Sequence, residues 1–207
     1  MNRQLLIIFV KNIKLGKVKT RLAKTIGNQI AFLVYKTLVE VTEKATENLT
    51  VEKRIYFSDT SLDSKWKNEA KFVQYGENLG DRMKNAFEDG FKDDYKNIIL
   101  IGSDLPDISE EIILNGFSEL NTNDLVFGPA EDGGYYLIGM TKLNEFIFKD
   151  KPWSTSNLLK LTLQELRNKQ YTYSLLETYN DIDTFKDLEK SEFYKNRPNI
   201  QKLITKT

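Results

Sequence analysis

The sequence contains no cysteine and no histidine. Without cysteine there are no disulfide bonds and no thiol nucleophiles. Without histidine there is no imidazole base, and most zinc sites are excluded. Any chemistry therefore has to use carboxylates, lysine, arginine, hydroxyl groups and metal ions that prefer oxygen ligands, such as Mg²⁺ or Mn²⁺.

The sequence also lacks net charge and long apolar runs. Lysine plus arginine and aspartate plus glutamate each number 30, so charge gives no reason to expect a nucleic acid or a membrane surface as partner. No apolar run approaches the ~20 residues of a membrane span, and the segment 5–10 is short for a signal peptide. We expect a cytoplasmic protein whose residues 1–207 form one domain, with a loosely ordered tail from about 196 to 207. An oligomer is compatible with this sequence.

One stretch organises the chain. Residues 97–101 (NIILI) are typical of a strand buried on both faces in the middle of a parallel sheet, and Gly102 and Ser103 end this strand. Asp104 then follows at the carboxyl end of the strand, where open α/β sheets bind their ligands. Ser109, followed by two glutamates, predicts the capped first turn of a helix.

Strands and helices alternate along the chain, which predicts a three-layer, Rossmann-like α/β fold with a mostly parallel sheet. The segment 135–140 returns too soon for a helical crossover and is expected to pair antiparallel, as an edge segment. The remaining expected strands are 5–10, 54–58, 72–75, 97–101, 124–127 and 171–176. The expected helices lie at about 28–48, 81–91, 109–120, 143–148 and 157–166.

A basic loop follows the first strand. Lys17, Lys19 and Arg21 lie where backbone N–H groups and cationic side chains together favour phosphate. The loop matches neither the P-loop nor the dinucleotide-binding glycine pattern. A solvated, lysine-rich surface turn is the alternative interpretation.

Asp104 is the first candidate metal ligand, because Mg²⁺ is often held by one or two carboxylates together with substrate phosphates. Helix capping is the alternative for Asp104, and it is the favoured interpretation for Asp107. Asp181 and Asp183 form a second acidic pair. In extended backbone their side chains point the same way, so both could reach one cation, with Asp183 as the expected ligand. Capping of the next helix by Asp183 or Thr184 is the alternative.

The loop after residue 128 combines Glu131 and Asp132 with Gly133 and Gly134, followed by Tyr135. The acids are candidates for a general base or for an acceptor of hydrogen bonds from a sugar hydroxyl, and the glycines would let a substrate approach the backbone. An acidic hairpin turn is the alternative.

Two further segments carry polar groups. Asn78, Gly80 and Arg82 could bind a base or ribose, although the segment could equally be an ordinary connection from strand to helix. Trp153, with Ser154 and Thr155 after it, could contact an acceptor, although tryptophan in this setting is more often part of the core. The tetrad 153–156 is also a candidate helix cap.

These segments, in this order, resemble a bacterial glycosyltransferase-like family related to the phospholactate guanylyltransferase of coenzyme F420 synthesis. The resemblance implies the nucleotide-diphospho-sugar transferase (GT-A) fold, and it implies that Asp104 plays the metal-binding part of the acidic motif of such enzymes. The segment 15–21 departs from the glycine-rich loop of sugar nucleotidyltransferases. The matching stretches are GKVKTRLA (16–23), GENLGDRM (76–83), ILIGSDLPD (99–107), DLVFGPAEDGGYYLIGM (124–140), PWST (152–155) and DIDTFKDL (181–188).

We therefore expect an Mg²⁺- or Mn²⁺-dependent transferase that uses a nucleotide-activated small-molecule donor and a small acceptor. Asp104, Glu131 and Asp132 are the expected catalytic residues. Ser103 is expected to contact the phosphates or the nucleotide, together with Lys17, Lys19, Arg21, Asn78, Gly80 and Arg82. Glycosyl transfer is the leading reaction, and nucleotidyl transfer from a nucleoside triphosphate is the alternative. The sequence is also compatible with a non-catalytic nucleotide-binding module and with a phosphatase of the haloacid-dehalogenase type, whose D-x-D-x-[TV] motif normally follows the first strand.

Overall fold

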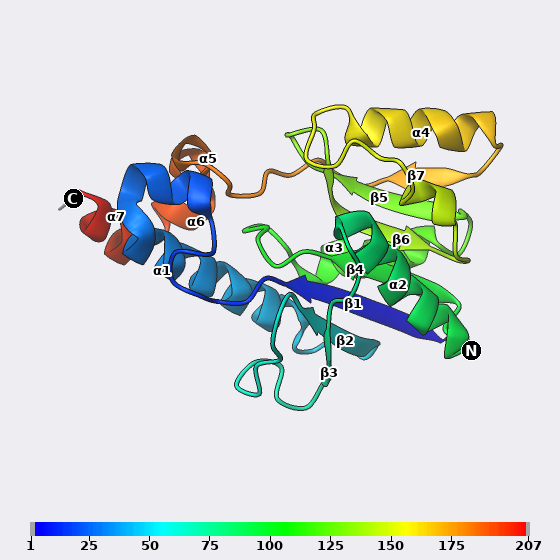
Figure 1. The fold of residues 1–207 in the computed structure, drawn as a ribbon, viewed down its shortest axis with the longest axis horizontal. Coiled ribbons are helices and arrows are strands. Elements are labelled where there is room, and N and C mark those ends of the chain that lie inside the picture. The colour runs from blue at the N-terminus through cyan, green and yellow to red at the C-terminus, as the bar shows by residue number, and fades with distance from the viewer. Residues whose placement is uncertain (1–2, 206–207) are drawn as a thin grey trace.

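The computed structural model describes residues 3–205 as a seven-stranded sheet between two layers of helices (Figure 1). The strand order is β3-β2-β1-β4-β6-β5-β7. Pairing is parallel except at β6, which runs antiparallel to both of its neighbours. The strands are β1 (Gln4–Val10), β2 (Glu52–Phe57), β3 (Ala70–Val73), β4 (Asn97–Ile101), β5 (Leu125–Pro129), β6 (Tyr135–Met140) and β7 (Tyr173–Leu175).

Alternate residues of the buried strands supply two hydrophobic layers, one on each face of the sheet. Leu6 and Ile8 of β1 pack in the layer shared with α1 (Thr20–Thr46) and α3 (Glu110–Glu119). Leu5 and Ile7 pack in the opposite layer, with α2 (Leu79–Lys92) and α4 (Leu158–Asn168). The three-layer α/β fold expected from the sequence is confirmed.

The antiparallel direction of β6 is confirmed, but its expected place at an edge is wrong. β6 lies between β4 and β5, and its segment 136–140 is buried. The short β5–β6 connection brings the chain straight back beside β5, and β7 then adds as the outer strand, parallel to β5. An interior position suits this strand, because β6 is almost entirely apolar.

Helix α1 begins at Thr20, eight residues before the start expected from the periodicity. The helix is kinked at Gly27, whose φ of 78° lies in the left-handed region that favours glycine. The expected helix from about 28 is the part after this kink. The turns before it bury Leu22 and Ile26 against the end of the chain, so tertiary contacts sustain them.

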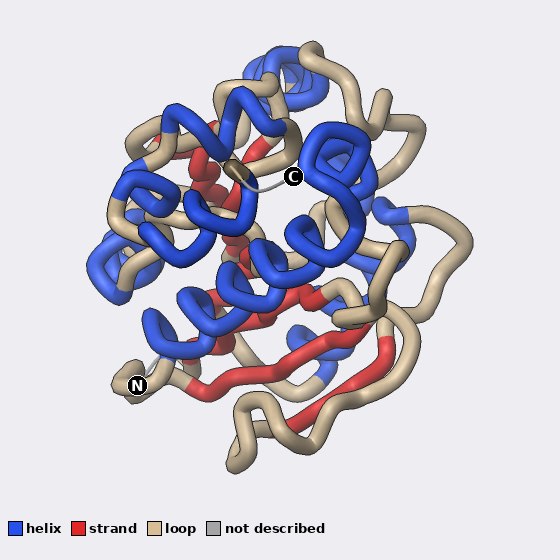
Figure 2. The backbone as a smooth tube through the Cα atoms, turned by 90° about the vertical axis from the view of Figure 1, so that its left-hand side faces the viewer, coloured by secondary structure: helices blue, strands red, loops and turns tan. Residues whose placement is uncertain are grey.

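The chain ends in three short helices, α5 (Phe185–Lys190), α6 (Glu192–Lys195) and α7 (Pro198–Ile204). Residues 198–204 were expected in a loose tail and instead form α7, because Ile200 is buried against α1 together with Leu188 and Phe193. Figure 2 shows these helices beside α1. Residues 206–207 of the expected tail lie outside the described residues.

Two further expected elements are present with changed boundaries, and one expected helix cap is absent. The helix expected at 143–148 is a single 3₁₀ turn, η1 (Glu145–Ile147), and the strand expected at 171–176 is the shorter β7. The tetrad 153–156 does not cap α4, which begins after Asn157 without a side-chain cap. Within residues 3–205, the helices are too short or too polar to cross a membrane.

Candidate functional site

Several connecting segments meet at the carboxyl edge of the sheet, and they line two adjoining hollows. A polar hollow of about 430 Å³ lies beside the loop after β1, and an apolar hollow of about 250 Å³ lies beside the loop after β5. Phe9, Leu79, Gly102 and Asp104 line both hollows. Asp104, delivered by the central strand β4 as expected, therefore stands at their junction.

Asp104 forms a partly buried ion pair with Lys19. The Lys19 Nζ donates to Asp104 Oδ2 at 3.0 Å, and the Lys19 side chain is only 6% exposed. Burial works to lower the pKa of Lys19, but the neighbouring carboxylates, with Asp104 foremost, outweigh burial and raise it. Lys19 precedes α1 with a left-handed backbone (φ 46°), a conformation that points its side chain from the loop to the sheet edge. Lys19 is therefore a fixed positive charge beside Asp104.

Tyr35 of α1 fastens the loops on either side of this pair. Its hydroxyl donates to the Lys11 carbonyl at 3.0 Å, accepts from the Lys11 N–H at 2.9 Å and lies 3.0 Å from Ser103 Oγ. Burial raises the pKa of Tyr35, so the hydroxyl stays protonated. The ends of β1 and β4 are thus held in register at the point where Asp104 emerges.

The C-terminal strap, which we define as residues 176–184, crosses the site between β7 and α5 (Figure 1). Its Tyr179 pairs with the loop after β5, accepting from Glu131 N at 3.1 Å and donating from its own N–H to Pro129 O at 3.1 Å. Asp183 accepts from Arg21 Nη1 at 2.8 Å, at the far end of the strap. The strap is therefore tied to the protein on both sides of Asp181.

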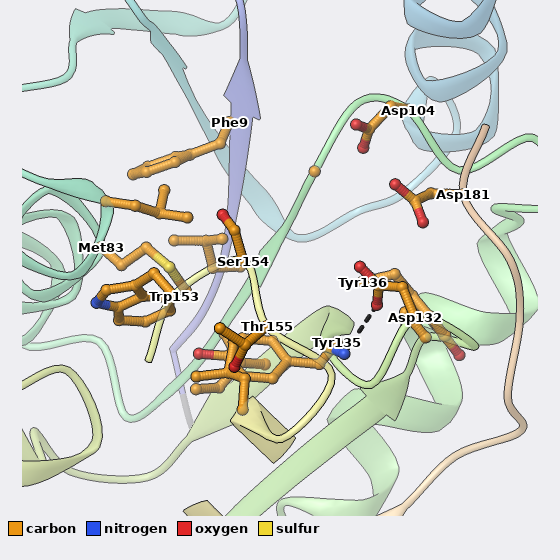
Figure 3. A pocket seen from close by; sticks show the side chains of 17 residues that line it. Phe9, Met83, Asp104, Asp132, Tyr135, Tyr136, Trp153, Ser154, Thr155 and Asp181 are labelled. Atoms are coloured by element: carbon orange, nitrogen blue, oxygen red, sulfur yellow. Dashed lines mark hydrogen bonds between the residues drawn. The ribbon is translucent and has the colours of Figure 1, made fainter. Parts of the chain in front are cut away.

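Asp181 lies next to Asp104, with both carboxylates at the same side of the apolar hollow (Figure 3). Burial and then the charge of Asp104 raise the pKa of Asp181 to about 6, although Lys19 opposes this shift. Two close carboxylates near one lysine leave excess negative charge at this point. Such a site attracts a cation or a proton.

The apolar hollow has a hydrophobic floor and a polar rim (Figure 3). Its rim carries Asp104, Asp132, Asp181, Ser154 and Thr155. Its floor and walls are formed by Phe9, Leu79, Met83, Leu100, Tyr135, Ile138, Trp153 and Leu158.

The structure gathers most of the candidate residues at these hollows. Arg82, Ser103 and Asp183 line the polar hollow together with Lys19 and Asp104. Asp132, Gly134, Tyr135, Trp153, Ser154 and Thr155 line the apolar hollow. Asp132 is also engaged within its own loop, where its Oδ1 accepts from Gly134 N at 2.8 Å.

Further candidates lie away from the hollows. Lys17 and Glu131 are exposed and line neither of them. Asn78 caps α2 by accepting from Asp81 N at 3.0 Å, and the buried Gly80 packs against Trp153, so both serve the structure of this loop. Gly133 similarly gives the backbone room beside Ser156.

One capping expectation is corrected, and the expected caps at Ser109 and Thr184 are confirmed. Ser109 caps α3, so the expectation that Asp107 is the cap is wrong. Thr184 caps α5 in a capping box with Asp187, which leaves the carboxylate of Asp183 free to pair with Arg21.

Sequence reasoning missed several lining residues. Lys11, Ser58 and Gln74 complete the polar hollow, and Phe9 and Met83 belong to the apolar one. Lys11 and Ser58 directly follow β1 and β2, so their position at the ends of parallel strands was a usable signal. Phe9 and Met83 read as ordinary core residues, and only the packing shows that they face a hollow.

The carboxylates at the site supply only part of the ligand set of a hard divalent cation. Within residues 3–205, no group of three or more acidic side chains is arranged to enclose a metal ion. Asp104 and Asp181 provide two oxygen-bearing groups, and Mg²⁺ commonly takes one or two carboxylates and completes its shell with water and substrate phosphates. The donor set therefore fits Mg²⁺ or Mn²⁺ held jointly with a phosphorylated ligand.

Comparisons with known proteins give both a family and a fold. Residues 41–155 match DUF2064, described as an uncharacterized protein conserved in bacteria. A crystal structure from Desulfovibrio desulfuricans G20, described as a candidate nucleotide-diphospho-sugar transferase, aligns with a TM-score of 0.87 at 30% identity, covering 100% of this chain and 98% of that one. No protein of curated function matches the chain.

More distant structures share the fold alone. The 4-diphosphocytidyl-2C-methyl-D-erythritol synthase from Anaerococcus prevotii DSM 20548 aligns with a TM-score of 0.58 at 13% identity, over 94% of this chain and 98% of that one. The inositol-1-phosphate CTP transferase from T. maritima aligns with a TM-score of 0.54 at 16% identity, over 96% of both chains. The expected nucleotide-diphospho-sugar transferase fold is thus confirmed.

Proposed function

The chain belongs to the bacterial family DUF2064, and from the site that its fold assembles we propose that it is a transferase that acts on a nucleotide-activated donor. Glycosyl transfer from a nucleotide-diphospho-sugar, dependent on Mg²⁺ or Mn²⁺, is the reaction that we favour. The observation that carries this proposal is the position of Asp104, at the junction of a cationic hollow and an apolar hollow. The description of the Desulfovibrio desulfuricans protein supports the same class.

The polar hollow suits the diphosphate end of the donor. Lys11, Lys19 and Arg82 line it, and such cations bind phosphate oxygens by charge-assisted hydrogen bonds. Arg21 lies nearby and forms an ion pair with Asp183. Because its side chain is 68% exposed, it can turn to a phosphate at little cost in free energy. We assign these four side chains to the donor.

Asp104 and Asp181 are the residues that we propose to hold the divalent cation, with Asp183 as a further candidate. Asp181 replaces Asp183 as the favoured partner because it lies beside Asp104, whereas Asp183 is engaged with Arg21. A bound Mg²⁺ or Mn²⁺ would offset the negative charge of the departing diphosphate. Asp132, on the rim of the apolar hollow, is placed to orient an acceptor hydroxyl.

Nucleotidyl transfer is the second candidate. It is favoured by the same cationic lining of the polar hollow, because three cations suit the triphosphate of a nucleoside triphosphate as well as a diphosphate. In that reaction a phosphate oxygen of the acceptor would attack the α-phosphate and pyrophosphate would leave. A phosphate acceptor is already a nucleophile and needs no base.

Ligand-dependent stabilisation tests the proposal. The wild-type protein is heated with each nucleotide sugar or nucleoside triphosphate in Mg²⁺, Mn²⁺ or EDTA. A ligand at 100 times its Kd should stabilise by ~2.7 kcal/mol, which is roughly 5–11 °C in Tm for a chain of this size. A preferred nucleotide sugar supports glycosyl transfer, and a preferred triphosphate supports nucleotidyl transfer.

Asp104→Asn keeps a hydrogen-bond acceptor for Lys19 and removes the charge, so we expect it to abolish the metal-dependent part of the shift. Asp107→Asn, on the same loop and outside both hollows, is the matched control and should behave as the wild type. Nucleotide binding that is unchanged by EDTA and by Asp104→Asn would instead indicate a non-catalytic binding module. Absence of any shift from a folded protein would contradict the proposal.

A further inference from the structure

We propose that the apolar hollow binds the acceptor and selects an alcohol with an aryl or alkyl body over a sugar or other polyol. This inference rests on the proposed transferase function, because it names the substrate class for the second half of the same site. Four features of the hollow support it, namely the chemistry of its floor, its size, its polar rim and the packing that holds it open.

The floor offers almost no hydrogen-bonding groups to a ligand. Phe9 and Ile138 come from two strands, Met83 from α2, and Trp153 and Leu158 from the segment over the site. A polyol on this surface would give up its bonds to water without replacement, which disfavours it strongly. An aryl or alkyl group instead gains from leaving water.

Apart from the indole N–H of Trp153, the polar side-chain atom of the floor belongs to Tyr135. Its hydroxyl is buried and has no hydrogen-bond partner within residues 3–205. Because this hydroxyl is closed off from the surface, it offers no hydrogen bond to a ligand in the hollow. A sugar carries several hydroxyls, so this floor cannot match it.

The size of the hollow fits a small hydrophobic body. Its volume is about 250 Å³. An engineered cavity of about 150 Å³ lined by similar side chains holds benzene. The hollow therefore has room for a substituted ring or a short branched chain, but for little more.

The polar rim places the reacting group. With the apolar body on the floor, the hydroxyl would lie at the rim near Asp132 and Asp181, next to Asp104 and the donor compartment. The bond that forms joins the alcohol oxygen to the anomeric carbon of the sugar. The bond that breaks joins that carbon to the diphosphate, which leaves as nucleoside diphosphate, while the hydroxyl proton passes to a rim carboxylate.

The hollow is held open by packing. A Cβ on Gly133 would lie 2.1 Å from the carbonyl oxygen of Ser156, so these two segments touch at the backbone. Leu159 N also donates to Gly133 O at 3.0 Å, and Gly80 packs directly on the Trp153 ring. Trp153 and its neighbours are therefore held in place beside the hollow by packing.

Fluorine NMR of 5-fluorotryptophan-labelled protein tests the inference, because the chain has two tryptophans and one of them lines the hollow. Trp66 is the internal reference, since it is buried elsewhere with its Nε1 donating to Thr46 Oγ1 at 2.9 Å. Benzyl alcohol, 2-phenylethanol and 3-phenylpropanol are titrated without nucleotide or metal, with glycerol and glucose as polar controls. We expect a saturable shift of the Trp153 signal alone, with affinity rising about fourfold for each added methylene until the hollow is full.

Two substitutions locate the binding. Leu158→Asn should weaken alcohol binding about tenfold, because it places an amide on the wall. Leu79→Asn is a second variant at an exposed position of the wall that both hollows share, and it should weaken binding in the same direction if Leu158→Asn fails to fold. Leu161→Asn is the matched control, because Leu161 is 45% exposed, close to the 46% of Leu79, and lies outside the hollow.

Several outcomes would overturn the inference. These are a Trp153 signal that does not respond to the alcohols, an equal response to glycerol or glucose, and displacement of the bound alcohol when the nucleotide is added after the titration. Displacement would assign the hollow to the donor's base. Because the titration uses no nucleotide, its failure leaves the ligand-stabilisation test standing. A failed nucleotide test with intact alcohol binding would refute only the proposed donor.

Discussion

Replacing Asp181 by asparagine is expected to stabilise the folded protein at neutral pH. Burial and Asp104 raise the pKa of Asp181 from 3.8 to about 6. Between these two values the folded state binds more protons than the unfolded state, so Asp181 makes stability fall as the pH rises from about 4 to about 6. Above that range the cost is constant.

The magnitude follows from the difference of about 2 pH units between the folded and unfolded pKa values. At 1.36 kcal/mol per unit, ionised Asp181 costs on the order of 3 kcal/mol. The neutral amide avoids this cost and keeps the shape. Asp181→Asn should therefore raise Tm by roughly 6–12 °C at pH 8, and the difference from the wild type should vanish below about pH 4.

Urea and thermal unfolding at pH 4, 6 and 8 measure this difference, in EDTA so that no cation occupies the carboxylates. Asp183→Asn is the control, because Asp183 is 40% exposed and paired with Arg21, and we expect it to give no comparable gain. The reasoning is refuted if Asp181→Asn and the wild type differ equally at pH 4 and pH 8. It is also refuted if the variant is the less stable at pH 8.

Two further substitutions test the packing around the site. Ile200→Ala should destabilise by ~2–5 kcal/mol in urea unfolding, because it leaves a cavity where α7 meets α1, while the exposed Lys202→Ala should change little. A change below 0.5 kcal/mol at Ile200 would mean that α7 does not dock as described. Gly133→Ala should destabilise by several kcal/mol, since the new methyl meets Ser156 O at 2.1 Å at φ +90°. Gly27→Ala, with φ +78°, ψ 158° and nothing within 4 Å, should lose only the backbone strain of ~1–3 kcal/mol. Equal losses at Gly133 and Gly27 would contradict the clash.

Most strands could be located from the sequence because the buried ones, above all β1 and β4, are short apolar runs between polar or glycine-rich segments. NIILI followed by Gly102 and Asp104 predicts a central strand and an acid at its carboxyl end, and both are found. The antiparallel β6 followed from a connection too short for a helix. Its interior place did not, because strand order depends on contacts between segments far apart in the chain.

The candidate site was predictable where a residue follows a strand, and less so elsewhere. Lys19 and Asp104 were both expected near phosphate and metal, but their ion pair depends on a left-handed turn before α1 that no local pattern specifies. The path of the strap, which places Asp181 beside Asp104 and Asp183 on Arg21, could not be read from the local sequence. Glu131 and Asp132 are neighbours in sequence, yet only Asp132 lines a hollow, since the loop turns between them.

The docking of the C-terminal helices onto α1 has a consequence for how the candidate site is held together. The Arg21–Asp183 ion pair joins residues 162 positions apart, so it closes one of the longest loops that this chain can make. Contacts between such distant positions raise contact order and slow folding, and chain ends are among the regions where proteins open locally. Release of α5, α6 and α7 would break the tie at Asp183 and leave the Tyr179 backbone pairing as the remaining tie beside Asp181. Local opening of the C-terminal helices would therefore loosen the placement of Asp181 beside Asp104 before the sheet unfolds.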